Sequence, residues 1–458
     1  MAFYNNVIAG AAGAGSADDY LVNRSLRLDE NTQGHLHFQP SQQGNRRKYT
    51  FSCWFKRAKL TGTGEHKLWG NSVSNSAYTQ LYFTNTDKLV WHIQTGYLIT
   101  DRHFKDTSAW YHVVVQVDTD QAAAANRSKI YINGELIQYP SEYSSMSWTS
   151  STYQYNTTIN DTSKHTLSGK QDYSNSHYFD GLIAEVNFID GSYLDASSFG
   201  LFHADTGEWV PKKYSGSYGT NGYYLDFSNS SNIGEDQSGR GNNWTTANVD
   251  SGDIFKDSPT NDEENDVGNY TTLNFNDSPN VDNGSLSNGA LDFVGDQQSY
   301  SMLRATQPIP STGKWYYEAK FQGNAYNPRN IGSQHTAVGF CKTHEPITGI
   351  TDGNSTWIAD SGYGTVFGST RTDWHGADVD QGAVVGVAIN REANQAWFFV
   401  NGVKKQVAGL GKHGYEDLSP FVYSYNNTAA SLECNFGQKA FSHYPVHSDF
   451  VENASTNA

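Results

Sequence analysis

The chain has 458 residues, a formal net charge of −16 and a hydrophobic content of 37%, with aromatic residues making up 14%. A chain of this length exceeds the size at which one hydrophobic core stops growing, so we expect two domains. The negative charge disfavours nonspecific binding to nucleic acid and to anionic membranes. No stretch has the roughly 20 apolar residues of a membrane span, so we expect no membrane insertion.

Residues 1–19 are expected to form an N-terminal arm. The segment 9–16, AGAAGAGS, has almost no side chain to bury. Such an arm is either a flexible terminus or extended backbone packed against another protein, and the sequence leaves both open. The first residues lack the basic region and apolar core of a secretory signal peptide, so we expect synthesis in a reducing cytoplasm.

The three cysteines are too few for a disulfide scaffold. Cys53, Cys341 and Cys434 all lie in strand-like contexts, which favours small buried apolar side chains. A Cys341–Cys434 pair is the alternative.

Residues 20–250 contain short apolar runs separated by polar turns, at the spacing of a β-sandwich. The run WYHVVVQVD at 110–118 alternates, which places every second valine on one face. The run KIYINGELI at 129–137 follows it, and its Asn133-Gly134 dipeptide suits a type I′ turn.

The same pattern occurs a second time near the end of the chain. It reads VVGVAIN at 384–390 and AWFFVNGV at 396–403, with Asn401-Gly402 at the turn. No long segment has helical periodicity, so helices should be few and short. Two copies of one hairpin predict an all-β chain of two tandem jelly-roll sandwiches.

Four segments of the first block resemble, in order, the laminin-G/pentraxin branch of the concanavalin A-like superfamily. They are TFSCWFK at 50–56, AWYHVVVQVD at 109–118, IYINGE at 130–135 and FDGLIAEV at 179–186. The resemblance implies a concanavalin A-type sandwich over residues 20–250. Sandwiches of this type often hold Ca²⁺ at the rim of a loop. By this resemblance, Asp236, Asp250 and Asp253 are candidate Ca²⁺ ligands. We expect no metal and no cofactor, with a Ca²⁺ site as the alternative.

Residues 251–285 read as a polar, acidic linker on composition. The segment DSPTNDEEND at 257–266 has few apolar residues to tie the two halves together. We therefore expect cleavage there to release two folded β fragments.

Residues 286–447 resemble a SPRY domain, which is also a concanavalin A-like sandwich, and residues 448–458 are left as a tail. The resemblance is carried by GKWYYEAK at 313–320, HTAVGFC at 335–341, GAVVGVAIN at 382–390, AWFFVNG at 396–402, LSPFVY at 418–423 and LECNFG at 432–437. In that family, loops at one end of the sandwich bind proteins or peptides.

The corresponding loops here are long and aromatic. Aromatic side chains in polar loops suit stacking on sugar rings or anchoring a protein partner. The alternative is that these rings fold back over the ends of the sandwich. The candidate ligand-binding residues are Tyr326, Arg329, Trp357, Tyr363, Trp374 and His375.

We expect a non-enzymatic protein without catalytic residues. The sequence has no His-Glu-x-x-His, no Walker-type phosphate loop and no Gly-x-Ser-x-Gly elbow. Some concanavalin A-like sandwiches degrade polysaccharides, so a polysaccharide-degrading enzyme stays as a less favoured alternative.

The whole chain resembles virion surface proteins of tailed bacteriophages, especially marine and cyanobacterial ones. The resemblance rests on the opening MAFYNNVIAGAAG and on laminin-G-like and SPRY-like blocks joined by a connector with DSPTN. It implies a tail fibre, knob or capsid decoration protein on the virion surface, made in the host cytoplasm. It also implies other virion proteins as partners, a homo-oligomer, and a host-surface glycan or protein as ligand. A purely structural component without a ligand is the alternative.

Overall fold

The structure is a computed structural model. It describes residues 20–60, 64–74, 76–147, 150–169, 177–262, 265, 267–274, 276, 284–295, 300–323, 335–343, 356–360, 364–367, 370–372, 382–410, 417–425 and 430–443. The chain divides into two compact units after Asn269. This division falls within the segment 251–285 that composition assigned to a linker.

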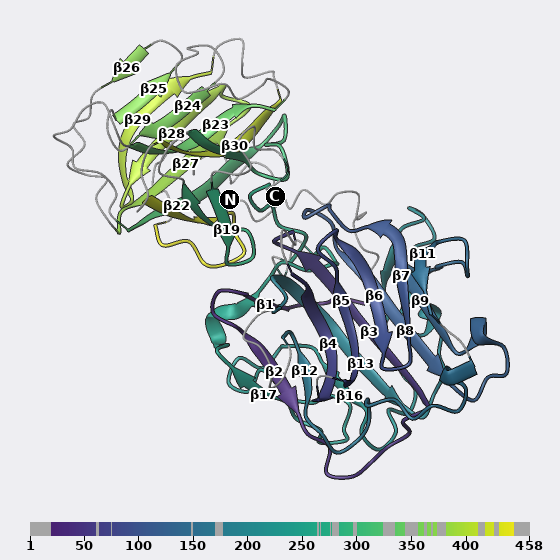
Figure 1. The fold of residues 1–458 in the computed structure, drawn as a ribbon. Helices are drawn as coiled ribbons and strands as arrows, with labels where there is room; N and C mark the ends of the chain where they lie inside the picture. Colours follow the sequence, from purple (N-terminus) through teal and green to yellow (C-terminus); the bar gives the residue numbers. More distant parts are fainter. Residues whose placement is uncertain are drawn as a thin grey trace. The chain divides into compact units, whose positions relative to one another are not determined.

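Both units are built of β-strands (Figure 1), which confirms the predicted all-β class. Helix in the described residues is limited to short 3₁₀ turns, η2 (Ala124–Asn126), η3 (Ser150–Thr152), η4 (Ala196–Ser198) and η5 (Ser251–Asp253). None of these turns is long or apolar enough to cross a membrane.

The first unit has two antiparallel sheets, which we name sheet A and sheet B (Figure 1). Sheet A runs in the order β10 (Glu135–Leu136), β9 (Ser128–Ile132), β8 (Tyr111–Asp118), β3 (Lys48–Arg57), β13 (Gly181–Asp190), β1 (Ser25–Leu28) and β18 (Ile254–Phe255), with β16 (Tyr223–Leu225) also paired to β13. Sheet B runs in the order β11 (Tyr143–Met146), β7 (Gly96–His103), β6 (Lys88–Ile93), β5 (Ala77–Phe83), β4 (His66–Ser74), β12 (His165–Leu167), β2 (His35–Phe38) and β17 (Thr245–Ala247).

Large aromatic side chains fill the core of the first unit. The Phe51 and Trp69 rings stack with centroids 4.0 Å apart, and the Trp69 and Trp91 rings stack with centroids 6.0 Å apart. The Trp69 indole donates a hydrogen bond of 3.0 Å to Tyr223 Oη, so its one polar group is satisfied inside the core. Trp244 is buried in the same cluster, next to the closing strand β17.

The outer face of sheet A is also covered. Val114 and Ile189 point away from the main core and pack against Phe199, Tyr218 and Tyr224. The covering segment includes the hairpin of β14 (Gly200–Phe202) and β15 (Trp209–Pro211). Strand β8 is therefore buried on both faces, beyond the single buried face that alternation alone predicted.

Residues 251–269 belong to the first unit and are not a solvated linker. Strand β18 pairs with β1, and the Asp257 side chain is fully buried. Asp257 Oδ2 forms an ion pair of 2.9 Å with Lys56 Nζ on β3. Composition was misleading because a buried ion pair uses the same residue types as an exposed loop.

The second unit has two further antiparallel sheets, which we name sheet C and sheet D. Sheet C runs in the order β19 (Gly284–Ser287), β20 (Asp292–Gly295), β31 (Ala430–Asn435), β22 (Lys314–Gly323), β27 (Val384–Asn390), β28 (Gln395–Val400) and β29 (Val403–Gly409). Sheet D runs in the order β21 (Tyr300–Arg304), β30 (Leu418–Tyr425), β23 (His335–Lys342), β24 (Thr356–Asp360), β25 (Gly364–Phe367) and β26 (Thr370–Thr372).

Side chains from both sheets meet in the core of the second unit. Tyr317 on β22 donates its hydroxyl to the Gly339 carbonyl on β23, which joins sheet C to sheet D. Cys341 and Cys434 are buried free thiols on opposite sheets, so the alternative disulfide is not formed. Trp397 is also buried, as are Trp54 and Trp110 in the first unit.

Candidate functional site

The outer face of sheet B, which points away from the core, carries the polar aromatic side chains of the first unit. Alternation along β5 sends Leu81 and Phe83 into the core, where they are fully buried. It places Tyr78, Gln80 and Tyr82 on the opposite face. The same alternation on β6 and β7 brings His92 and Tyr97 to that face, next to them.

Strand register aligns six positions into one row across this face. The row, which we call the Gly70 row, crosses β7, β6, β5, β4, β12 and β2 at Tyr97, His92, Gln80, Gly70, Thr166 and His37. Adjacent strands are about 4.8 Å apart, so the row is about 24 Å long. This length suits an extended ligand better than a single small molecule.

Edge-to-face contacts fix the rings at one end of the row. The His92 ring centroid lies 4.8 Å from that of Tyr78, with the planes at 85°, and 5.8 Å from that of Tyr97, at 78°. Lys67 Nζ lies 3.8 Å above the Tyr82 ring and is paired with Glu65. The aromatic end is therefore held in place before any ligand arrives.

Gly70 has no side chain at the centre of the row, and none would fit. Its φ is +153°, and an added Cβ would lie 2.3 Å from the Thr79 carbonyl oxygen. Between Gln80 and Thr166 the row therefore has only backbone at its surface, whereas the positions on both sides of Gly70 carry side chains.

The histidines of this face are neutral, and its Lys67 ammonium is paired with the Glu65 carboxylate. Burial lowers the pKa of His92 and of His37, so both imidazoles are neutral at pH 7. Two buried polar atoms of this face, Ser72 Oγ and His37 Nδ1, have no hydrogen-bond partner among the described residues. Neutral donors and acceptors beside aromatic rings match a hydroxyl-rich, uncharged ligand.

The residues that the sequence proposed as a binding site lie mostly outside the described residues. These are Tyr326, Arg329, Tyr363, Trp374 and His375. Trp357 lies on β24, directly opposite Phe340 on β23 and Phe367 on β25. The described residues therefore do not test this set, and its role stays a prediction.

Sequence reasoning missed the residues of the Gly70 row. Their signal was present as a period-two pattern, since YTQLYF at 78–83 and LVWHI at 89–93 alternate large apolar residues with polar aromatic or amide residues. Alternation locates a strand and its two faces, but it does not show which strands lie side by side. Only the register could show that these residues share one row.

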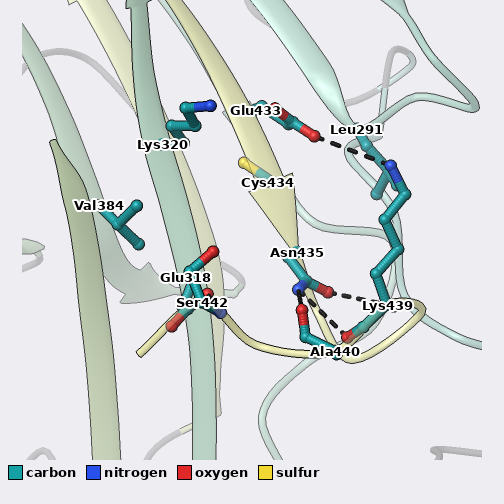
Figure 2. A pocket seen from close by; sticks show the side chains of 10 residues that line it. All are labelled: Leu291, Glu318, Lys320, Val384, Glu433, Cys434, Asn435, Lys439, Ala440 and Ser442. Atoms are coloured by element: carbon teal, nitrogen blue, oxygen red, sulfur yellow. Dashed lines mark hydrogen bonds and ion pairs between the residues drawn. The ribbon is translucent and has the colours of Figure 1, made fainter. Parts of the chain in front are cut away.

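A polar pocket of about 140 Å³ lies on the outer face of sheet C in the second unit (Figure 2). Figure 2 shows Glu318 and Lys320 from β22 beside Glu433 and Asn435 from β31, with the segment 439–442 along one side.

The two carboxylates that line this pocket, Glu318 and Glu433, are already engaged. Glu433 pairs with Lys439 at 3.8 Å and accepts a hydrogen bond of 2.5 Å from Gln322. The Glu318 carboxylate accepts hydrogen bonds of 2.7 Å from the backbone N–H groups of Ser442 and His443. The pocket therefore anchors the segment that follows β31, and its polar groups serve that anchoring.

One contact in the first unit resembles a catalytic dyad. Ser52 Oγ lies 2.8 Å from His112 Nε2, and the Trp209 indole N–H lies 3.0 Å from His112 Nδ1. An indole only donates, so Nδ1 is unprotonated and Nε2 carries the proton. Burial lowers the pKa of His112 to about 3. His112 therefore donates to Ser52 and cannot act as its base.

The three candidate Ca²⁺ ligands have separate structural roles. Asp236 accepts backbone hydrogen bonds from Tyr224, Ser238 and Asn242. Asp250 caps η5, and Asp253 pairs with Arg27. Among the described residues, no three His, Cys, Asp or Glu side chains are grouped so as to hold a metal ion.

Comparison with known proteins bears on the first unit most directly. Residues 30–196 match the model of a laminin-G family described as the concanavalin A-like lectin/glucanases superfamily. The matched range includes the whole of sheet B except β17. This range is similar to a laminin-G-type, concanavalin A-like domain.

Similar solved structures include SPRY domains. The SPRY domain of human HERC1 is 13% identical, with a TM-score of 0.30, over 37% of this chain and 99% of that one. The PSpry domain of TRIM65 is 12% identical, with a TM-score of 0.28, over 36% and 89%. Stonustoxin is 14% identical, with a TM-score of 0.26, over 36% and 27%. No curated protein sequence matches the chain.

Proposed function

We propose that this protein is a non-enzymatic binding protein whose laminin-G-like domain holds a neutral glycan on the outer face of sheet B. The Gly70 row carries the proposal. Its rings at His92 and Tyr97, with Tyr78 in contact with His92 beside the row, offer faces on which sugar rings stack. The imidazoles of His92 and His37 add neutral hydrogen-bonding groups for sugar hydroxyls at two positions of the same row.

The biological setting that we propose is the surface of a tailed-bacteriophage virion, as a tail fibre, knob or capsid decoration. The support is the resemblance of the whole chain to such proteins and its acidic, all-β composition. In that setting the arm at 1–19 contacts other virion proteins or further copies of this chain. The ligand is a glycan or protein of the host surface, which the SPRY-like loops at Tyr326–Asn330, Trp357–Tyr363 and Thr370–Asp378 also contact.

A glycan array tests the binding proposal. The intact chain is expected to bind neutral oligosaccharides, and Tyr78→Ala and His92→Ala each to weaken binding at least tenfold. Tyr153→Ala is the matched control, because Tyr153 is an exposed aromatic elsewhere in the first unit and should leave binding unchanged. Equal loss in all three variants, with unchanged melting temperatures, would contradict a site at the Gly70 row.

The same samples separate the alternatives. A purely structural component would bind no glycan and would still assemble into the particle. A polysaccharide-degrading enzyme would release reducing sugar or unsaturated uronate from the bound polymer. Deleting residues 2–16 is expected to abolish incorporation into the particle while both units stay folded, and normal incorporation would show that the arm is not an anchor.

A further inference from the structure

Lys56 Nζ lies between two side chains that are distant in sequence. It is 2.9 Å from Asp257 Oδ2 and 2.8 Å from Asn269 Oδ1. The Lys56 and Asp257 side chains are 2% and 0% exposed. The lysine and the carboxylate are thus almost closed to water, and the partly exposed amide of Asn269 meets them there.

Packing fixes each of the three groups. Trp110 donates its indole N–H to Asp257 Oδ1 at 2.9 Å, which orients the carboxylate. Asn269 Nδ2 donates to the Ser108 carbonyl at 3.0 Å, which turns its carbonyl oxygen towards Lys56. The carbonyl carbon of Asn269 is one bond beyond that oxygen, so the amine is held near the atom it would attack.

The amine and the carboxylate are also placed for proton transfer. Lys56 Nζ and Asp257 Oδ2 are 2.9 Å apart, which is hydrogen-bond distance. Transfer of a proton from Nζ to Oδ2 would give a neutral amine, which is a nucleophile, beside a carboxylic acid, which can donate a proton.

We propose that Lys56 and Asn269 form an intramolecular amide bond, with Asp257 as the proton carrier. Nζ adds to Cγ of Asn269 while Asp257 protonates the developing oxyanion. The C–Nδ2 bond then breaks, and the nitrogen leaves as ammonia with the proton that came from Nζ. Lysine amine plus primary amide gives secondary amide plus ammonia, so no oxidant or cofactor enters and Asp257 is regenerated.

The bond would tie the last residue of the first unit to strand β3, a central strand of sheet A. Force or thermal motion applied where the chain leaves this unit would then act on a covalent link. The segment 251–269 could not peel from sheet A without breaking that link. Such a tie suits a surface protein under load, although the inference stands on the three side chains and not on the proposed glycan site.

The mass of the intact, unmodified chain tests the proposal directly. It is expected to be lower than the sequence mass by one ammonia. Trypsin is expected not to cleave after Lys56, and a digest should contain one branched peptide joining Lys56 to Asn269. An intact mass equal to the sequence mass would overturn the proposal without any variant.

Two variants and a control assign the bond. Asn269→Ala and Lys56→Arg should each restore the full sequence mass, adjusted for the substitution, while Lys88→Arg should keep the deficit. A deficit of one ammonia without a branched peptide would indicate a cyclic imide and would overturn the proposal. A deficit of one water, with Asp257 in the branched peptide, would overturn the assignment of Asn269 as acceptor.

Discussion

Asn401 and Val384 are joined by a pair of hydrogen bonds across the hairpin of the second unit. Asn401 N–H donates to the Val384 carbonyl at 2.8 Å, and Val384 N–H donates to Asn401 Oδ1 at 2.9 Å. Asn133 and His112 repeat this arrangement in the first unit, at 2.9 Å and 2.7 Å. In each unit, the asparagine side chain of the Asn-Gly turn thus accepts a hydrogen bond from the backbone of a neighbouring strand.

Asn401→Ala is therefore expected to lower the free energy of unfolding of the second unit by about 1–3 kcal/mol. Asn401 has φ of +49°, so alanine loses the side-chain hydrogen bond and also strains the turn. Asn401→Gly removes the side-chain hydrogen bond but accepts this φ, so it should cost less than alanine. Thermal unfolding by circular dichroism measures both. Equal losses would mean that the side-chain hydrogen bond, and not the backbone, carries the whole effect.

Trp397→Ala is expected to cost roughly 3–5 kcal/mol of the second unit's stability. Trp397 is buried on the outer face of sheet C with Tyr316, Ala388 and Phe399, so its removal leaves a cavity. Val403→Ala is the control, because Val403 is 59% exposed and should change stability little. Chemical denaturation of both variants gives the comparison. An unchanged midpoint for Trp397→Ala would contradict the packing of this face.

A fragment of residues 20–269 is expected to fold, whereas a fragment of residues 20–250 should be markedly less stable. The shorter fragment lacks Asp257, which leaves the Lys56 ammonium buried without its anionic partner, at a cost of about 3–5 kcal/mol. Lys56→Met in the shorter fragment should recover part of this loss. Thermal unfolding of the three samples measures these differences in stability. Equal melting temperatures for the two fragments would mean that residues 251–269 are a linker after all.

The first unit is expected to lose stability as the pH rises through 7. Burial raises the pKa of Glu185 to about 7, although Tyr224 and Tyr20 donate hydrogen bonds to its carboxylate. A carboxyl whose folded pKa is raised stabilises the fold below its unfolded value and loses that contribution as pH passes the folded value. Burial raises the pKa of Asp180 to about 7 as well, with the same sign.

Glu185→Gln isolates one of these two groups. Urea unfolding of wild type at pH 5.5 and pH 8 should show a drop in stability, and the variant should show a drop smaller by up to about 2 kcal/mol. The remaining drop in the variant belongs to Asp180 and other groups. An identical drop in both proteins would mean that Glu185 does not titrate in this range.

The repeated hairpin was readable from the sequence because its information is local. Alternating valines and an Asn-Gly dipeptide determine strand, face and turn within a few residues. The structure confirms both turns, with positive φ at Asn133, Gly134, Asn401 and Gly402. The burial of Trp54, Trp110 and Trp397 followed from the same strands, since a large aromatic ring in a β-rich run is most stable away from water.

The Gly70 row and the Lys56 site were decided only by tertiary structure. Tyr97 and His37 share a row because register aligns strands that are far apart in the chain, and register depends on the whole sheet. Asp257 and Asn269 read as solvated linker residues until the fold brings them to Lys56. By itself the sequence determined the strand faces, the turns and the all-β class, because these are local preferences; which polar side chains meet was determined by long-range pairing.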